Sequence, residues 1–176
     1  MKSINHTIDE KTTSLVFYDN SHTKIKFVNE IINSYNNSIF YVDFDLLFSG
    51  YYESGLISKI SNIEIFRPNE ENYLKIISEI IKRATLEKTI IILDSLNGLH
   101  NSIAKIPDSG RLVNSLIMFM TYNFKFSNSK LIISALSEKK ENQWVLYPTK
   151  RQILEIENMN RLFIEENKSK LQFQIL

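Results

Sequence analysis

The chain of 176 residues contains no cysteine, only four glycines and three prolines, and almost no excess of either charge. The absence of cysteine excludes a disulfide framework, a cysteine-ligated zinc site and a thiol nucleophile. A net charge of +1 gives no overall attraction for nucleic acid or acidic lipid, so such binding would need a local patch. The apolar runs are far shorter than the ~20 residues of a membrane span. Because the N-terminal stretch is also polar, with no apolar signal segment, we expect a soluble, cytoplasmic protein with no membrane partner.

Two kinds of periodicity alternate along most of the chain. Apolar runs rich in β-branched residues predict strands at 15–18, 39–44, 63–66, 89–93 and 130–135. Apolar residues at helical spacing predict helices over 24–35, 69–84 and 108–124. Apolar residues gather on one face of two of these helices and are expected to face the core: Leu74, Ile77, Ile80, Ile81 and Ala84 in the second, and Leu112, Leu116, Phe119 and Met120 in the third. The run TIIIL at 89–93 lacks polar alternation, which is typical of a strand buried on both faces of a parallel sheet.

The C-terminal part of the chain has a different pattern. Short apolar segments follow one another, and FIEENKSKLQF at 163–173 predicts two antiparallel strands around a polar turn. The alternating strands and helices before it imply a mostly parallel sheet covered by helices. We therefore expect an α/β fold in a single domain over residues 1–176, with 1–13 as a flexible or peripheral N-terminal segment.

The first strand-to-helix turn is where a nucleotide-binding α/β protein carries its phosphate loop, G-x-x-x-x-G-K-[ST]. Glycines there let backbone N–H groups wrap the phosphates, while the lysine and the hydroxyl serve the phosphates and Mg²⁺. In this chain the turn reads YDNSHTKI over 18–25, and none of the four glycines lies in it. If Lys24 is the phosphate lysine, Thr23 replaces the glycine before it and Ile25 replaces the hydroxyl residue. We therefore expect no ordinary Mg-ATP hydrolysis, although a helix N-terminus still favours anions.

Acidic residues end two of the expected strands. Asp94 follows TIIIL, where a carboxylate commonly holds Mg²⁺, but a role in capping the next turn fits equally well. Asp43 and Asp45 end the strand at 39–44, where a base could orient an attacking water. Ser95 follows Asp94 but lacks the G-x-S-x-G surroundings of a nucleophilic serine. No spacing of histidines predicts a metal site.

Together these segments resemble the RecA-like ATPases, in particular their RadA and KaiC branch. IIILDSLNGL at 90–99 is similar to the Walker B segment of that branch, an apolar strand that ends in Asp-Ser-Leu. IFYVDFD at 39–45 resembles its second core strand, which places Asp45 at or near the catalytic glutamate of the family. The segment 144–173 looks like its closing β-strands. The resemblance covers about residues 14–176 and departs most clearly in the Walker A segment.

The resemblance implies a RecA-like three-layer αβα sandwich with a vestigial nucleotide site at Lys24, Asp45, Asp94 and Ser95. It also implies assembly through RecA-type subunit contacts, with copies of the chain or paralogous RecA-like subunits as partners. We therefore expect a catalytically inactive scaffold or regulatory subunit, in a homo- or hetero-oligomer, that uses no cofactor or metal. A polar sensor of the family would fall at Ser134 or Ser137.

Two other functions stay open on the sequence. The first is a DNA-binding recombination or repair accessory of the RadA paralogue type, because basic and aromatic side chains that contact phosphates and bases gather near the C-terminal strands. The residues that would contact single-stranded DNA are Lys139, Lys140, Trp144, Lys150 and Arg151. A solvated hairpin explains the same residues, because Glu138 and Glu141 interrupt the basic run.

The second is a nucleotide-binding ATPase with an unorthodox phosphate loop. Lys24 or Lys26 would then bind the phosphates of ATP, with Mg²⁺ as its companion.

Overall fold

The computed structural model describes residues 3–58, 60–141, 143–147, 156–168 and 170–176. The strands are β1 (Thr13–Tyr18), β2 (Ser38–Asp43), β3 (Ile63–Phe66), β4 (Thr89–Asp94), β5 (Lys130–Lys140), β6 (Gln143–Leu146), β7 (Met159–Asn167) and β8 (Lys170–Ile175). The helices are α1 (Ile4–Glu10), α2 (Ser21–Ser34), α3 (Leu47–Glu53), α4 (Tyr73–Ala84), α5 (Leu96–Ser102) and α6 (Ser109–Ser127). Of the helices described, none is both long and apolar enough to cross a membrane.

The described strands join one 8-stranded sheet in the order β3-β2-β4-β5-β1-β7-β8, with β6 paired to β5 off this path. From β3 to β7 every neighbouring pair is parallel. The pairs β5–β6 and β7–β8 are antiparallel. The expected α/β fold, a mostly parallel sheet with antiparallel C-terminal strands, is therefore confirmed.

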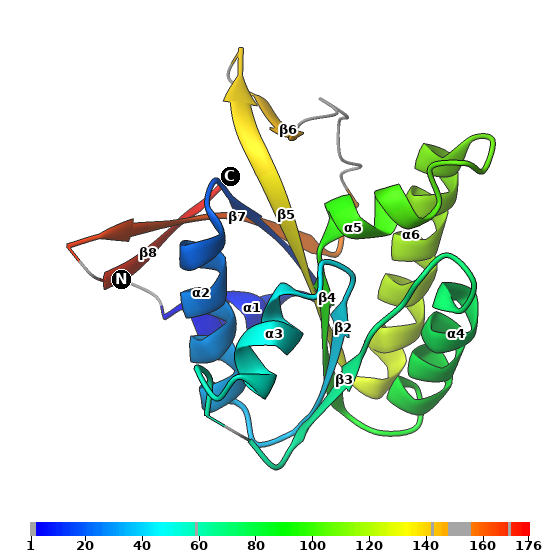
Figure 1. The fold of residues 1–176 in the computed structure, drawn as a ribbon, viewed down its shortest axis with the longest axis horizontal. Coiled ribbons are helices and arrows are strands. Elements are labelled where there is room, and N and C mark those ends of the chain that lie inside the picture. The colour runs from blue at the N-terminus through cyan, green and yellow to red at the C-terminus, as the bar shows by residue number, and fades with distance from the viewer. Residues whose placement is uncertain (1–2, 59, 142, 148–155, 169) are drawn as a thin grey trace.

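Helices cover both faces of the sheet, as Figure 1 shows: α1, α2 and α3 lie on one side, and α4, α5 and α6 on the other. Successive residues of a strand point to opposite faces. In β1, Leu15 and Phe17 enter the core beneath α4, α5 and α6, whereas Val16 and Tyr18 enter the core beneath α1, α2 and α3. Because both faces are covered, the strands need no polar alternation, which explains the apolar run in β4. The result is a three-layer sandwich, with the β5–β6 hairpin projecting beyond the sheet (Figure 1).

The N-terminal segment packs against this sandwich where it is described. The Ser3 hydroxyl caps α1 by accepting the N–H of His6. Ile4 and Ile8 of α1 are buried in the same core as α2. Lys130 of β5 donates hydrogen bonds to the Asp9 carbonyl, at 2.8 Å, and to the Lys11 carbonyl. Residues 3–13 are thus part of the folded structure and not a loose extension.

The face of α6 expected to be buried is correct at Met120 and partly so at Leu116, but it is wrong at Leu112 and Phe119. The buried apolar stripe consists of Val113, Ile117, Met120 and Phe124. Leu112 and Phe119 are exposed instead. Arg111 and Lys125 are the only charged residues of α6, so more than one apolar stripe fits helical spacing and the pattern alone does not choose between them. In α4 the expected face is confirmed at Ile77, Ile80 and Ala84, which are buried, but Leu74 is exposed.

Candidate functional site

The connection between β1 and α2 consists of Asp19 and Asn20 alone. The Asn20 side chain caps α2, because its oxygen accepts the Thr23 N–H at 2.9 Å and the Thr23 hydroxyl at 3.0 Å. The helix therefore begins before Lys24, earlier than the sequence indicates. So short a connection cannot form the glycine-rich loop that wraps phosphates. Asn20 also occupies one of the N–H groups that a helix N-terminus would otherwise present to an anion.

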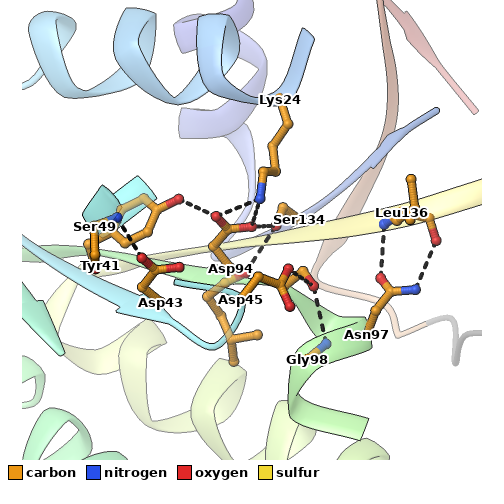
Figure 2. Close-up of polar contacts among 12 residues, drawn as sticks. Lys24, Tyr41, Asp43, Asp45, Ser49, Asp94, Asn97, Gly98, Ser134 and Leu136 are labelled. Carbon is orange, nitrogen blue, oxygen red and sulfur yellow. Dashed lines mark hydrogen bonds and ion pairs between the residues drawn. The ribbon is translucent and has the colours of Figure 1, made fainter. Parts of the chain in front are cut away.

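Lys24 lies in the first turns of α2 and points into the protein, towards the end of β4 (Figure 2). Its Nζ donates to both oxygens of the Asp94 carboxylate, each at 2.8 Å. The two side chains are 1% and 0% exposed, so the pair is shielded from water. The structure thus brings together two residues of the expected nucleotide site, but it bonds them to each other. A buried charge is stable only when it is paired and hydrogen-bonded in this way.

Two hydroxyl groups complete the surroundings of the Asp94 carboxylate. Ser134 Oγ on β5 donates to Asp94 Oδ1 at 2.6 Å, and the Tyr41 hydroxyl on β2 donates to Asp94 Oδ2. Burial and the charge of Asp94 raise the pKa of Tyr41 well above its usual value, so the phenol keeps the proton that it donates. Ser134 is one of the two sensor positions expected from the sequence. Tyr41 was missed, and the only signal for it is a phenol on a strand face that is otherwise apolar.

Asp43 lies beside Asp94 in the register of β2 and β4 and is fully buried. Its Oδ2 accepts the Ser49 N–H at 2.7 Å, whereas its Oδ1 has no hydrogen-bond partner among the described residues. Burial raises the pKa of Asp43, and the negative charge of Asp94 adds to this effect. A carboxyl group enclosed in this way does not reach solvent, so Asp43 is not placed to orient an attacking water, whereas Asp45 is exposed.

We expect the free energy of unfolding of Asp43→Asn to increase relative to that of the wild type as the pH rises. A raised pKa means that the folded protein binds more protons than the unfolded chain above the usual value of 3.8, so stability falls with rising pH in that window. Asparagine keeps an oxygen for the Ser49 N–H and removes the titration. Urea unfolding of both proteins between acidic and neutral pH measures this, and a difference that does not change with pH would contradict it.

Asp45 and Ser95 form a second contact at the same end of the sheet. The Ser95 hydroxyl donates to Asp45 Oδ2 at 2.7 Å and accepts the Gly98 N–H at 3.1 Å, which caps α5 (Figure 2). The structure therefore brings these two expected site residues together as a structural cap. Tyr18 ends β1 nearby, and its pKa is raised by burial and by the charges of Asp94 and Asp45.

Asn97 is a further polar residue that the sequence did not single out. Its amide nitrogen donates to the carbonyls of Leu136, at 3.0 Å, and Tyr147, at 2.7 Å, and its oxygen accepts the Leu136 N–H at 2.9 Å. Asn97 thus fixes the start of α5 to the base of the β5–β6 hairpin (Figure 2).

The residues considered for nucleic acid do not form one surface in the described part of the chain. Lys139 and Lys140 are exposed near the tip of the hairpin. Trp144 instead stacks on Phe163, with ring centroids 4.2 Å apart, and on Phe17 at 6.0 Å. A ring held in these contacts is not free to stack on a base. Lys150 and Arg151 lie outside the described residues.

A groove of about 630 Å³ lies where α2 begins, next to the hairpin. Its lining combines Asp19 and Glu138 with Lys139, Trp144 and Tyr147. Because acids and a base share this wall, the groove presents no uniformly positive surface to phosphates. In the described part of the chain, no group of His, Asp or Glu side chains is arranged to hold a metal ion.

Comparison with known proteins adds no assignment. No model of a protein family matches the chain. A search of curated proteins found none that is similar to it in sequence.

Proposed function

We propose that this chain is a non-hydrolysing protein of the RecA-like class that serves as a scaffold or regulatory subunit in a homo- or hetero-oligomeric complex. The observation that carries the proposal is the buried ion pair between Lys24 and Asp94, with Nζ 2.8 Å from both carboxylate oxygens. In a working ATPase of this kind the lysine serves phosphates and the carboxylate serves Mg²⁺. In this chain each satisfies the other.

Binding of Mg-ATP would require this pair to separate. Removing one partner of a buried ion pair costs about 3–5 kcal/mol, and nucleotide contacts would have to exceed that loss before any net affinity appeared. A Mg²⁺ ion could take the place of Lys24 beside Asp94, but Ile25 stands where the family places the hydroxyl that holds the ion. The Asp19–Asn20 connection is also too short, and has no glycine, to wrap phosphates with backbone N–H groups.

The two alternatives have less support. Lys26 is ion-paired with Glu166 of β7, which lowers the pKa of that carboxyl, so Lys26 is engaged away from Asp94. Of the basic residues expected to contact DNA, Lys139 and Lys140 are the two that lie in the described part of the chain, and both are exposed. Trp144, the aromatic residue expected to stack on a base, is stacked on Phe163 instead.

We expect the purified protein to release no phosphate from Mg-ATP or Mg-GTP above the rate in buffer. Calorimetric titration with either nucleotide should give no heat of binding. Asp94→Ala is the control, because contaminating ATPase activity would persist in this variant. Turnover by the wild type that disappears in Asp94→Ala would overturn the proposal and favour the ATPase with an unorthodox loop.

A further inference from the structure

The solvent-facing side of α6 is apolar over most of its length. The exposed residues that form this patch are Leu112, Met118, Phe119, Tyr122 and Phe126, which are 40%, 52%, 55%, 66% and 72% exposed. Tyr122 and Phe126 meet edge to face, with ring centroids 5.1 Å apart. Large apolar side chains are ordinary on a surface when they are scattered, but not when they lie along one helix face. We call these five residues the α6 patch.

The charge of α6 also sets it apart from the neighbouring helix. Apart from Arg111 and Lys125, no residue of α6 is charged, and none is acidic. The outer side of α4, by contrast, carries charged residues such as Glu79, Lys82 and Arg83. Large apolar side chains that gather on the outer face of a helix are normally covered by another surface. The sequence of α6 therefore indicates a helix that is covered on its outer face as well.

The patch is large enough for the centre of a stable interface. An aromatic side chain presents ~150–250 Å², so the exposed fractions of the five residues amount to roughly 500 Å² of apolar surface. This lies near the upper end of the ~300–600 Å² found for the largest patch of a monomer. It is smaller than the ~800 Å² that each partner buries in an interface of standard size, so polar neighbours such as Asn123 and Lys125 must add to the contact.

We propose that the α6 patch is an interface between two copies of this chain, in which the two α6 helices pack antiparallel about a two-fold axis at Tyr122. Tyr122 lies midway between Met118 and Phe126, which are one helical turn to either side, whereas Leu112 has no residue of the partner's α6 level with it because that helix ends at Ser127. In this register Met118 of one copy lies level with Phe126 of the other, a sulfur–aromatic combination that contributes favourably. The part of the patch from Met118 to Phe126 is thus complementary to itself, as a two-fold interface requires.

Charge selects the antiparallel arrangement over the parallel one. A parallel pair would place Arg111 next to Arg111 and Lys125 next to Lys125, and these like charges would repel. In the antiparallel pair the two Lys125 side chains are displaced along the helices by six residues in total, which is ~9 Å at 1.5 Å per residue. At physiological salt this separation is about one Debye length, so the repulsion is largely screened. In the antiparallel pair the two helix dipoles also point in opposite directions, which is the favourable arrangement.

This pairing involves none of the residues of the nucleotide site. It gives the proposed scaffold a partner, a second copy, without depending on whether nucleotide binds. Turnover of Mg-ATP would overturn the proposed function and leave the α6 interface intact. A monomer in solution would overturn the α6 interface and leave the absence of ATP turnover as proposed.

The oligomeric state in solution tests the interface. We expect sedimentation velocity of the intact chain to give a dimer that dissociates on dilution. Tyr122→Glu places two carboxylates together at the axis and should weaken the dimer by about 30-fold or more, the effect of losing a hot-spot residue. Leu56→Glu is the matched control, because Leu56 is 74% exposed and follows α3 on the other face of the sheet, and it should leave the dimer unchanged. Circular dichroism checks that both variants are folded.

The lack of cysteine allows the register to be tested directly, because any introduced cysteine is the only thiol. With a short bis-maleimide cross-linker, Tyr122→Cys should link to itself. Met118→Cys should link to Phe126→Cys when the two variants are mixed, but not to itself. A monomer at every concentration, or cross-linking equal in Leu56→Cys and Tyr122→Cys, would overturn the proposal. Self-linking of Met118→Cys with no link to Phe126→Cys would overturn the antiparallel register.

Discussion

Replacing Lys24 by methionine is expected to lower the free energy of unfolding by about 3–5 kcal/mol, the usual cost of removing one partner of a buried ion pair. Methionine is close to lysine in length and fills the same space, so little of this loss comes from a cavity. The loss comes from Asp94, which stays 0% exposed without its ion-pair partner and keeps only its hydrogen bonds from the hydroxyls of Ser134 and Tyr41 among the described residues. Equilibrium unfolding in urea measures the change. A domain with a total stability of ~5–15 kcal/mol would lose a large share of it.

The control for this variant is an ion pair of the same length at the surface. Lys105 lies 2.8 Å from Glu70, but the two side chains are 82% and 60% exposed. Lys105→Met should therefore cost less than about 1 kcal/mol. The double variant Lys24→Met/Asp94→Asn should recover much of the loss, because asparagine is neutral, and its oxygen can accept from one of the two hydroxyls while its NH2 group donates to the other. If Lys24→Met costs no more than Lys105→Met, Asp94 is not held by Lys24, and the main support for a closed nucleotide site is lost.

Much of the fold could be predicted because it depends on local patterns. The alternation of apolar runs with helical spacing indicated a parallel sheet between helices, and FIEENKSKLQF indicated the β7–β8 hairpin. The buried face of α6 could not be predicted in the same way. Leu112 and Phe119 satisfy helical spacing as well as Val113 and Ile117 do, and so few residues of α6 are charged that charge could not decide which stripe faces solvent.

The candidate site shows a different limit. The positions of Lys24 and Asp94 after two strands marked them in the sequence. The sequence assigned Lys24 to the phosphates of a nucleotide and Asp94 to Mg²⁺. That they bond to each other depends on how far α2 reaches over the end of β4, which no local pattern contains. Tyr41 was missed for the same reason, since its hydroxyl finds Asp94 only across the β2–β4 register.

Gly98→Ala is expected to destabilise the protein by about 1–3 kcal/mol, the usual cost of adding a methyl group to a closely packed site. A Cβ at this position would lie 2.5 Å from Phe44 Cβ and 2.6 Å from Asp45 Oδ1. Neither atom can move away easily. Phe44 Cβ is attached directly to the backbone, and the Asp45 carboxylate is held by the Ser95 hydroxyl at 2.7 Å. The clash outweighs the ~1 kcal/mol by which alanine favours a helix over glycine.

Gly50 provides the matched control, because it also lies within a short helix and a Cβ there would meet nothing within 4 Å. Gly50→Ala should therefore stabilise the protein by about 0.5–1 kcal/mol, so the same substitution has opposite signs at the two glycines. Urea unfolding of both variants measures the difference. If Gly98→Ala were neutral or stabilising, the segment of Phe44 and Asp45 would have to shift easily, and the contact between Asp45 and Ser95 would not be a fixed part of this end of the sheet. A large loss would mean that glycine, absent from the turn before Lys24, is needed instead where α5 approaches Asp45, which is a requirement of packing and not of phosphate binding.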